Sequence, residues 1–194
     1  LNQKTKLKAI LENVQTWTAD LSTPLVTMVS YSIIHRQGLE HYVAQAKQAG
    51  VAGAIVPDLL VEEAPEFAAI CEREDFSLIQ LVTPTTPRDR ALRICETTSG
   101  FLYYVSVTGI TGARQELPPE VVDQVGWLKS ETELPVCIGF GISQAEQVKM
   151  LSQVADGIIV GSAIVKRVAA AADIGKAKAL ENVLAFVQEL IAQL

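Results

Sequence analysis

The chain has 194 residues, of which 49% are hydrophobic, and it carries a formal net charge of −6 at pH 7. This length is enough for one sizeable core, and the composition is typical of a packed globular protein and not of a disordered one. Acidic and basic residues are interspersed and the apolar runs are short and broken by charges, so we expect no nucleic-acid partner and no membrane partner.

Strand and helix patterns alternate along the whole chain. An amphipathic helix is predicted first, over about residues 5–17, because its apolar residues share one face. Six strands are predicted next, at Pro24–Tyr31, Ala52–Pro57, Ser77–Thr83, Gly100–Val107, Pro135–Gly139 and Asp156–Gly161. Helices are predicted after them, at Gly38–Ala49, Val61–Glu72, Pro87–Thr97, Pro118–Ser130, Ser143–Ser152, Ala163–Ala170 and Ile174–Ala192.

Two helix starts carry recognisable signals. Ser143 stands before a helix and Glu146 follows three residues later, which is a capping-box pattern. Pro87 follows Thr86, and proline is favoured at the first position of a helix.

The strands are continuous apolar runs, which is typical of parallel strands covered by helices on both faces. Alternating strands and helices fit either an open doubly wound sheet or a closed eight-stranded barrel. Glycine turns follow the last two strands, where barrels commonly bind phosphate, and this placement favours a (β/α)8 TIM barrel. By that count the chain is a single domain over residues 1–194, truncated to about six β/α units and incomplete at its N-terminal side.

The two glycine turns suggest a phosphate site. Glycine lets backbone N–H groups approach an anion closely, and the start of the next helix adds a favourable dipole. The residues with the right types and places are Gly139, Gly141, Gly161 and Ser162. The alternative is that these glycines only make tight turns between strand and helix.

Other candidate residues follow other strands. Two Thr-Gly pairs lie in the segment Ser106–Glu120, which could close over a substrate or be an ordinary loop. Asp58 ends its strand and could either belong to an active site or cap the next helix. Glu62 and Glu63 begin that helix, and we expect their negative charges to interact favourably with the positive end of its dipole.

The aromatic and imidazole side chains give weaker signals. Tyr103 and Tyr104 are adjacent on one strand, so one should face the barrel interior and the other the helices. His35 and His41 lie around a loop and a helix start, and neither has a nearby acid and nucleophile, so we expect local structural roles.

The three cysteines, Cys71, Cys95 and Cys137, are far apart in the chain. Their spacing matches neither a zinc site nor a disulfide framework, so we expect no metal and a cytoplasmic location. All three are expected to be small buried hydrophobic residues.

Several segments together resemble one known family. They read VPDLLVEEAPEF, LVTPTTPRDR, YYVSVTGITGAR, IGFGIS and ADGIIVGSAIVK, and they lie in the order found in the tryptophan synthase alpha chain. The resemblance covers the chain from about Lys4 to the C-terminus. It implies a TIM barrel of the ribulose-phosphate-binding type.

The resemblance also implies a function. Members of that family cleave indole-3-glycerol phosphate to indole and glyceraldehyde 3-phosphate, a carbon–carbon lyase reaction of tryptophan biosynthesis. They carry no cofactor of their own and pair with a beta chain. Carried over to this chain, the phosphate-binding residues would be Gly112, Gly141, Gly161 and Ser162. The substrate pocket would also contain Phe140 beside the phosphate, Tyr103 by the indole ring and Thr111 in the closing loop. Asp58, at the end of its strand, is a further candidate for that pocket.

This chain departs from the family pattern in two places. The family's catalytic glutamate and aspartate precede the region that corresponds to Leu1, so none of the expected catalytic residues is present. The family usually has Asn-Pro after a tyrosine near its beta-chain contact, whereas this chain has Ser32-Ile33 after Tyr31.

Three functions therefore remain open at this point. The chain could be an alpha chain of the lyase, a non-catalytic relative that binds the phosphate substrate or product, or a different phosphate-binding barrel lyase or isomerase.

Six parallel strands cannot close an eight-stranded barrel without a change of tilt and shear. We therefore expect self-association through the open edges at Pro24–Tyr31 and Asp156–Gly161.

Overall fold

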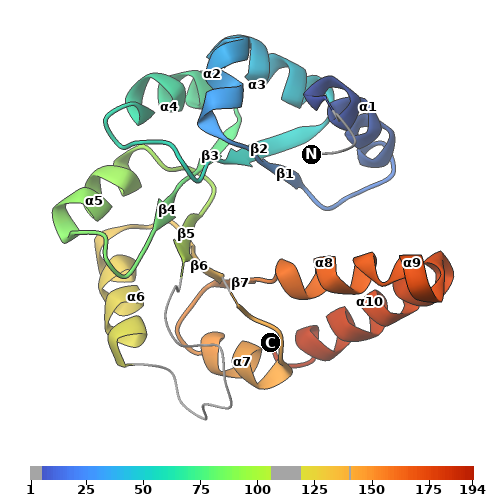
Figure 1. The fold of residues 1–194 in the computed structure, drawn as a ribbon. Coiled ribbons are helices and arrows are strands. Elements are labelled where there is room, and N and C mark those ends of the chain that lie inside the picture. Colours follow the sequence, from blue (N-terminus) through green and yellow to red (C-terminus); the bar gives the residue numbers. More distant parts are fainter. Residues whose placement is uncertain (1–5, 106–118, 140) are drawn as a thin grey trace. The chain divides into compact units, whose positions relative to one another are not determined.

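A computed structural model describes residues 6–105, 119–139 and 141–194 as helices joined to parallel strands (Figure 1). The described residues fall into two compact units. The first contains those up to Leu81 together with Pro87–Leu102, and the second contains Val82–Thr86 and those from Tyr103 to Leu194. The single domain over residues 1–194 stays a prediction.

The first unit is built on a parallel sheet in the order β1-β2-β3. The register aligns Met28 with Ile55 and Ile55 with Ile79. Its elements are α1 (Leu7–Thr18), β1 (Leu25–Met28), α2 (Tyr31–Gln37), α3 (Leu39–Gln48), β2 (Val51–Ile55), α4 (Ala64–Arg73), β3 (Ser77–Ile79) and α5 (Arg88–Glu96).

Aromatic side chains fill the core of the first unit between sheet and helices. The ring of Tyr42 lies 6.5 Å from that of Phe67 and 6.3 Å from that of Phe76, and all three are buried. The Tyr42 hydroxyl lies 2.7 Å from the Thr27 hydroxyl, so Thr27 of β1 faces the helices. Its neighbours Val26 and Met28 are exposed, which follows from the alternation of side chains along a strand.

The second sheet has the order β4-β5-β6-β7. Strands β6 and β7 are parallel, with Gly139 beside Ile159, so both strands end at the same edge of the sheet. The elements are β4 (Leu81–Val82), β5 (Leu102–Val105), α6 (Pro119–Glu131), β6 (Val136–Gly139), α7 (Ala145–Leu151), β7 (Gly157–Ile159), α8 (Ser162–Ala169), α9 (Ala171–Ile174) and α10 (Lys176–Ile191).

The first predicted strand is too long, and a helix was missed. Strand β1 ends at Met28, and Tyr31 is the first residue of α2, not a strand residue. The apolar run of Pro24–Tyr31 continues past the end of the strand, and this hid the helix start.

The predicted strand Ser77–Thr83 is divided into β3 and β4 at Gln80, which is buried. The Gln80 amide donates to the Thr97 hydroxyl at 2.7 Å and lies 3.3 Å from the Thr98 hydroxyl, after α5. These contacts satisfy a polar side chain at the interruption between two apolar runs.

The predicted helix starts also need correction. The side chain that accepts hydrogen bonds at the start of α7 is Gln147, not Glu146, and it accepts from Ser143 N–H at 2.8 Å and from Gln144 N–H at 3.0 Å. Pro87 lies just before α5 instead of at its first position. At the end of the chain, the predicted helix from Ile174 begins at Lys176, because Gly175 with φ of 82° ends α9.

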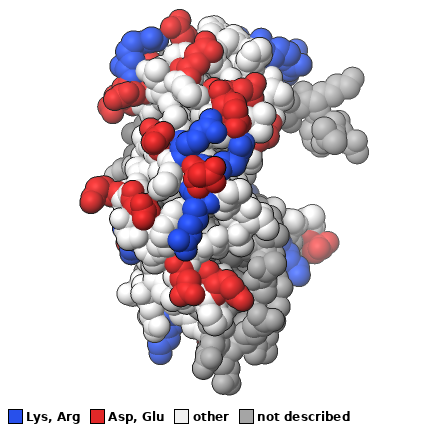
Figure 2. Space-filling view, turned by 90° about the vertical axis from the view of Figure 1, so that its left-hand side faces the viewer, with Lys and Arg blue, Asp and Glu red and all other residues white. Residues whose placement is uncertain are grey.

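Within the described parts of the chain, no helix has both the length and the apolar character needed to cross a membrane. On the face that Figure 2 shows, acidic and basic residues are mixed.

Candidate phosphate site

Two of the predicted phosphate-binding turns lie at one edge of the second sheet. Gly141 follows β6 and has φ of 77°, a conformation that glycine adopts without strain. Gly161 follows β7 as the N-cap of α8, and Ser162 is the first residue of that helix. Because β6 and β7 are parallel neighbours, both turns leave the sheet at its carboxyl edge.

The start of α8 is open to solvent. Gly161 and Ser162 are exposed, and a Cβ added at Gly161 would meet no described atom within 4 Å. The first N–H groups of a helix have no partner within the helix, and the helix dipole is positive at this end. The geometry therefore suits an anion bound by backbone donors.

Gly139 has a structural role that the sequence did not reveal. It lies within β6, and a Cβ at this position would lie 2.6 Å from the Tyr103 ring carbon Cε2. The glycine is therefore required because the buried Tyr103 ring packs against the backbone of β6. Direct phosphate binding is not needed to explain it.

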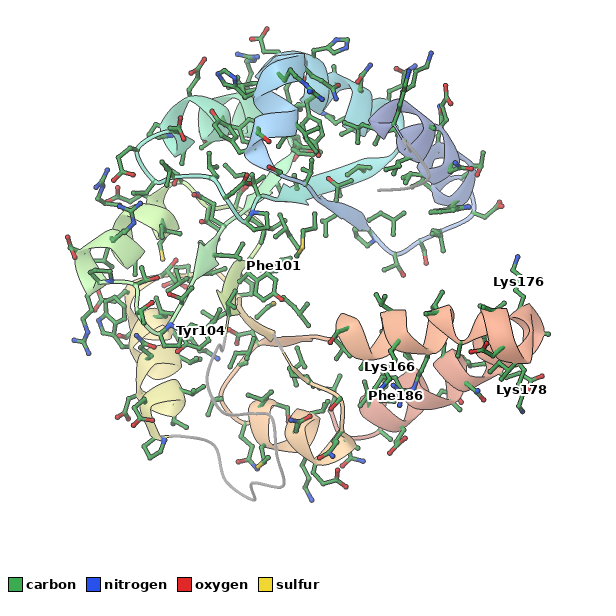
Figure 3. All side chains as sticks on the ribbon, in the orientation of Figure 1. Phe101, Tyr104, Lys166, Lys176, Lys178 and Phe186 are labelled. Carbon is green, nitrogen blue, oxygen red and sulfur yellow. The ribbon has the colours of Figure 1, made fainter. Side chains whose placement is uncertain are left out.

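Tyr103 and Tyr104 on β5 face opposite ways, as the sequence predicted. The Tyr104 hydroxyl donates to the Gln124 side chain on α6, toward which Tyr104 points in Figure 3. The Gln124 amide in turn donates to the Pro84 carbonyl at 3.0 Å. Burial raises the pKa of Tyr104 to about 12 and also raises the pKa of Tyr103, so both phenols stay protonated near neutral pH.

Asp58 in the first unit caps a helix, but not the one expected. Its carboxylate accepts from the Ser30 hydroxyl at 2.5 Å and from the Tyr31 N–H at 2.7 Å, and thus caps α2 instead of α4. Partial burial of the carboxylate favours its protonated form. The hydrogen bonds from Ser30 and Tyr31 outweigh that burial and hold the pKa of Asp58 below its ordinary value.

Glu62 was expected to interact with the dipole of α4, and the structure shows that it also forms ion pairs with two arginines of α5. Both terminal nitrogens of Arg90 donate hydrogen bonds to the Glu62 carboxylate, at 2.9 and 3.1 Å, and a terminal nitrogen of Arg93 lies 3.6 Å from it. Hydrogen bonds from Arg90 lower the pKa of Glu62. Glu63 is the N-cap residue of α4.

The histidines lie on two consecutive helices, so the loop position expected for one of them is wrong. His35 is in α2 and His41 is in α3, and the His35 ring lies 5.8 Å from that of Tyr31. The ring contact is consistent with a local structural role for His35.

The cysteines are free thiols with different burial. Cys71 is buried as expected, whereas Cys95 and Cys137 are only partly buried. Burial raises the pKa of Cys71 to about 12, and burial together with the nearby Asp156 carboxylate raises that of Cys137 to about 11. Among the described residues no three His, Cys, Asp or Glu side chains gather as a metal site would require.

Three predicted site residues, Thr111, Gly112 and Phe140, lie outside the described residues. Most of the segment Ser106–Glu120 also lies outside them. Within the second unit, the structure brings the ends of β6 and β7 to one edge, with β5 and Tyr103 beside β6.

Comparison with known proteins decides the family. A family model described as Tryptophan synthase alpha chain matches residues 1–194. The chain belongs to the tryptophan synthase alpha chain family. Its similarity to a tryptophan synthase alpha chain of Rhodopirellula baltica is 61% identity over 166 residues, which cover 86% of this chain and 60% of the relative. An alpha chain of Methanocaldococcus jannaschii is 48% identical over 145 residues, covering 75% of this chain and 52% of the relative.

Solved structures agree with this family. The chain is similar to one in the structure of the tryptophan synthase α2β2 complex of Pyrococcus furiosus, with a TM-score of 0.87 and 36% identity. That similarity covers 98% of this chain and 76% of the solved chain. The fold class is therefore the TIM barrel of this alpha chain family. The chain spans between 52% and 60% of the length of the two relatives above.

The sequence alone did not reveal the pairing of Ser30 and Tyr31 with Asp58. A serine before a helix is a known capping signal, but the apolar run around it predicted a strand instead. Gln124 on α6, which joins Tyr104 to Pro84, had no recognisable signal in the sequence.

Proposed function

We propose that this chain binds indole-3-glycerol phosphate and serves the alpha-chain reaction of tryptophan synthase, in which the substrate is cleaved to indole and glyceraldehyde 3-phosphate. Membership of the family supports the reaction class. The observation that carries the proposal is the exposed start of α8 at Gly161 and Ser162, beside the Gly141 turn at the same sheet edge.

In this proposal the substrate phosphate sits against the first N–H groups of α8. Gly161 leaves the approach open, the Ser162 hydroxyl and N–H donate, and the Gly141 turn contributes from the neighbouring strand end. Gly112 completes the set, as the family resemblance implies. Glycines let the anion come close to the backbone, and the helix dipole favours its charge.

The remaining pocket residues would hold the rest of the substrate. Tyr103 would lie beside the indole ring, and the notion of a pocket that also uses Phe140, Thr111 and Asp58 stays a prediction from the sequence. The lowered pKa of Asp58 keeps it ionised at neutral pH, so it does not suit the role of a general acid there.

Cleavage needs more than binding. Indole C3 must gain a proton, and a glycerol hydroxyl must lose one as the carbon–carbon bond breaks. The resemblance assigns these steps to a glutamate and an aspartate of the family's catalytic site. Substrate binding and turnover are therefore measured separately.

The binding test uses glycerol 3-phosphate as the probe and thermal unfolding as the readout. At ten times its Kd, the ligand stabilises the native chain by about 1.4 kcal/mol. We expect Gly161→Asp to abolish this stabilisation, because the added carboxylate repels phosphate at the start of α8.

Gly126→Asp is the matched control. Gly126 lies in α6, is exposed, and also has no described atom within 4 Å of an added Cβ. This variant adds the same charge and should keep the full shift. An unchanged shift in Gly161→Asp would overturn the site assignment.

Turnover is tested by measuring indole released from indole-3-glycerol phosphate. Release above the uncatalysed rate supports the lyase, and loss of that release in Gly161→Asp would tie it to this site. Binding without release would identify the chain as a phosphate-binding relative instead.

We further propose that the chain pairs with a tryptophan synthase beta chain and that it works in the cytoplasm. Support comes from the Pyrococcus furiosus relative, whose structure is of an α2β2 complex. Co-sedimentation with a purified beta chain tests the pairing. Because Ser32-Ile33 replaces the usual Asn-Pro, we expect Ser32→Asn with Ile33→Pro to strengthen it. If neither the wild-type chain nor the double variant sediments together with the beta chain, the proposal is contradicted.

A further inference from the structure

The turn that follows β4 is held together by its own threonines. The segment Val82–Thr86 belongs to the second unit. Within it, the Thr83 N–H donates to the Thr86 hydroxyl at 3.0 Å, and the Thr83 hydroxyl lies 3.0 Å from the hydroxyls of both Thr85 and Thr86. These bonds close within four residues, so the turn keeps its own shape and needs only one attachment to be fixed in place.

Gln124 of α6 supplies such an attachment. Its side-chain amide donates to the Pro84 carbonyl at 3.0 Å, and its side-chain oxygen accepts from the Tyr104 hydroxyl. A proline carbonyl can only accept, so the amide nitrogen must face Pro84 and the oxygen is left for Tyr104. We call Tyr104, Gln124 and Pro84 the Gln124 relay, which joins β5 to the turn through α6.

The Gln124 relay also bears on Tyr103, the neighbour of Tyr104 in β5. Side chains alternate between the two faces of a strand, so Tyr104 reaches α6 while Tyr103 faces the other way (Figure 3). The Tyr103 ring packs against the backbone of β6 at Gly139. Tethering the buried Tyr104 at its hydroxyl limits rotation of β5 about its own axis. This tether therefore also fixes the direction of the Tyr103 ring.

We propose that Gln124 is a positioning residue that sets the selectivity of the pocket for the aromatic part of its ligand. Through the Gln124 relay it holds the Tyr103 ring and the turn after β4 in the arrangement that accepts an indole ring. The phosphate site proposed at Gly141, Gly161 and Ser162 contains no residue of the relay, so phosphate binding does not depend on it. This proposal rests on the proposed function, which places the indole ring beside Tyr103.

Calorimetric titration of the full chain with two probes tests the proposal. Glycerol 3-phosphate carries only the phosphate part, whereas the phosphate ester of 3-indolylpropanol adds the indole ring and lacks the glycerol hydroxyls that cleavage requires. We expect Gln124→Leu to raise the Kd of the indolyl probe about tenfold, because a lost buried hydrogen bond leaves roughly one chain in ten with the Tyr103 ring correctly placed. The Kd of glycerol 3-phosphate should stay within about twofold of the wild-type value. General unfolding would lower the number of sites for both probes instead.

Two further variants break the two hydrogen bonds one at a time. Tyr104→Phe removes the donor on β5 and keeps the buried ring, whereas Gln124→Glu keeps an acceptor for Tyr104 and removes the donor to the Pro84 carbonyl. Each should weaken binding of the indolyl probe alone. Tyr104→Phe combined with Gln124→Leu should be no worse than Gln124→Leu, because both changes break the same relay.

Asp123→Asn is the matched control. Asp123 is exposed on α6 next to Gln124, and this variant should leave both Kd values unchanged. An equal loss of affinity for the two probes in Gln124→Leu, or no loss for either, would overturn this proposal and leave the proposed function intact. A wild-type chain that binds neither probe would overturn the proposed function and this proposal with it.

Discussion

At the scale of single residues, Asp58 shows how one carboxylate joins two segments of the first unit. It follows β2 and accepts hydrogen bonds from Ser30 and Tyr31, which begin α2. The segment after β1 is thereby tied to the segment after β2. Because these segments follow neighbouring parallel strands, the bond sets where α2 begins.

We predict that Asp58→Asn destabilises the chain at neutral pH. Asparagine has one oxygen acceptor where the carboxylate uses two, so one of the two hydrogen bonds is lost at a cost of about 0.5–1.5 kcal/mol, measured as the free energy of unfolding in urea. The pKa of Asp58 in the folded chain lies below the ordinary 3.8, so its ionised form stabilises the fold. The difference between wild type and variant should be complete above that value and disappear as the pH falls through the lower folded pKa.

Asp20→Asn serves as the control, since Asp20 is an exposed carboxylate after α1. It should change stability little at any pH. A wild-type advantage over Asp58→Asn that does not shrink as the pH falls below 3.8 would contradict the capping role.

Residue roles could be predicted where local geometry decides them. The opposite directions of Tyr103 and Tyr104 follow from strand alternation alone. The role of Gly139 could not be predicted, because it depends on Tyr103 of a neighbouring strand. The phosphate-binding roles of Gly141, Gly161 and Ser162 stay predictions.

At the scale of elements, the start of α7 depends on a buried glutamine. Gln147 is 4% exposed, and its side-chain oxygen accepts from the N–H groups of Ser143 and Gln144. The exposed Glu146 beside it was the capping residue expected from the sequence. The predicted capping box therefore has the right spacing but lies one residue too early in the chain, since the observed box joins Gln144 and Gln147.

We predict that Gln147→Ala destabilises the second unit by about 1–3 kcal/mol, because two N–H groups lose their acceptor near the buried side of the helix. Glu146→Ala removes an exposed neighbour and should cost much less. Thermal unfolding of both variants measures the difference. Equal losses in the two would show that Gln147 has no capping role.

Most elements could be predicted, because hydrophobic periodicity follows each strand and helix closely. The main failure is α2, where the apolar run of Pro24–Tyr31 looks like one long strand. The strand ends at Met28 because the chain turns to meet Asp58, which is distant in sequence. Local pattern carries no information about that contact.

At the scale of the whole molecule, the described strands at the ends of the two sheets include β1 and β7, the first and last strands of the chain. Strand β1 has β2 as its neighbour and β7 has β6. An exposed strand edge offers unpaired N–H and C=O groups to another chain. Met28 on β1 is 61% exposed, so this edge also presents an apolar side chain.

We predict that edge pairing makes the chain aggregate on heating. Met28→Lys should reduce the turbidity that develops during a thermal ramp, because a charge on an edge strand opposes pairing. Ile10→Lys makes the same change on α1, where Ile10 is 45% exposed, and should not protect. A clear solution and a cooperative, reversible melt of the wild-type chain would contradict the prediction.

The sequence by itself determined the parallel α/β class, the family and most element positions, because these follow from periodic burial and from motifs within short segments. Only the tertiary structure decided that Asp58 caps α2, that Gly139 accommodates Tyr103, and that Gln124 joins Tyr104 to Pro84. Each of these depends on which residues distant in sequence come into contact. Such contacts are set by the packing of elements against one another, and local pattern does not encode them.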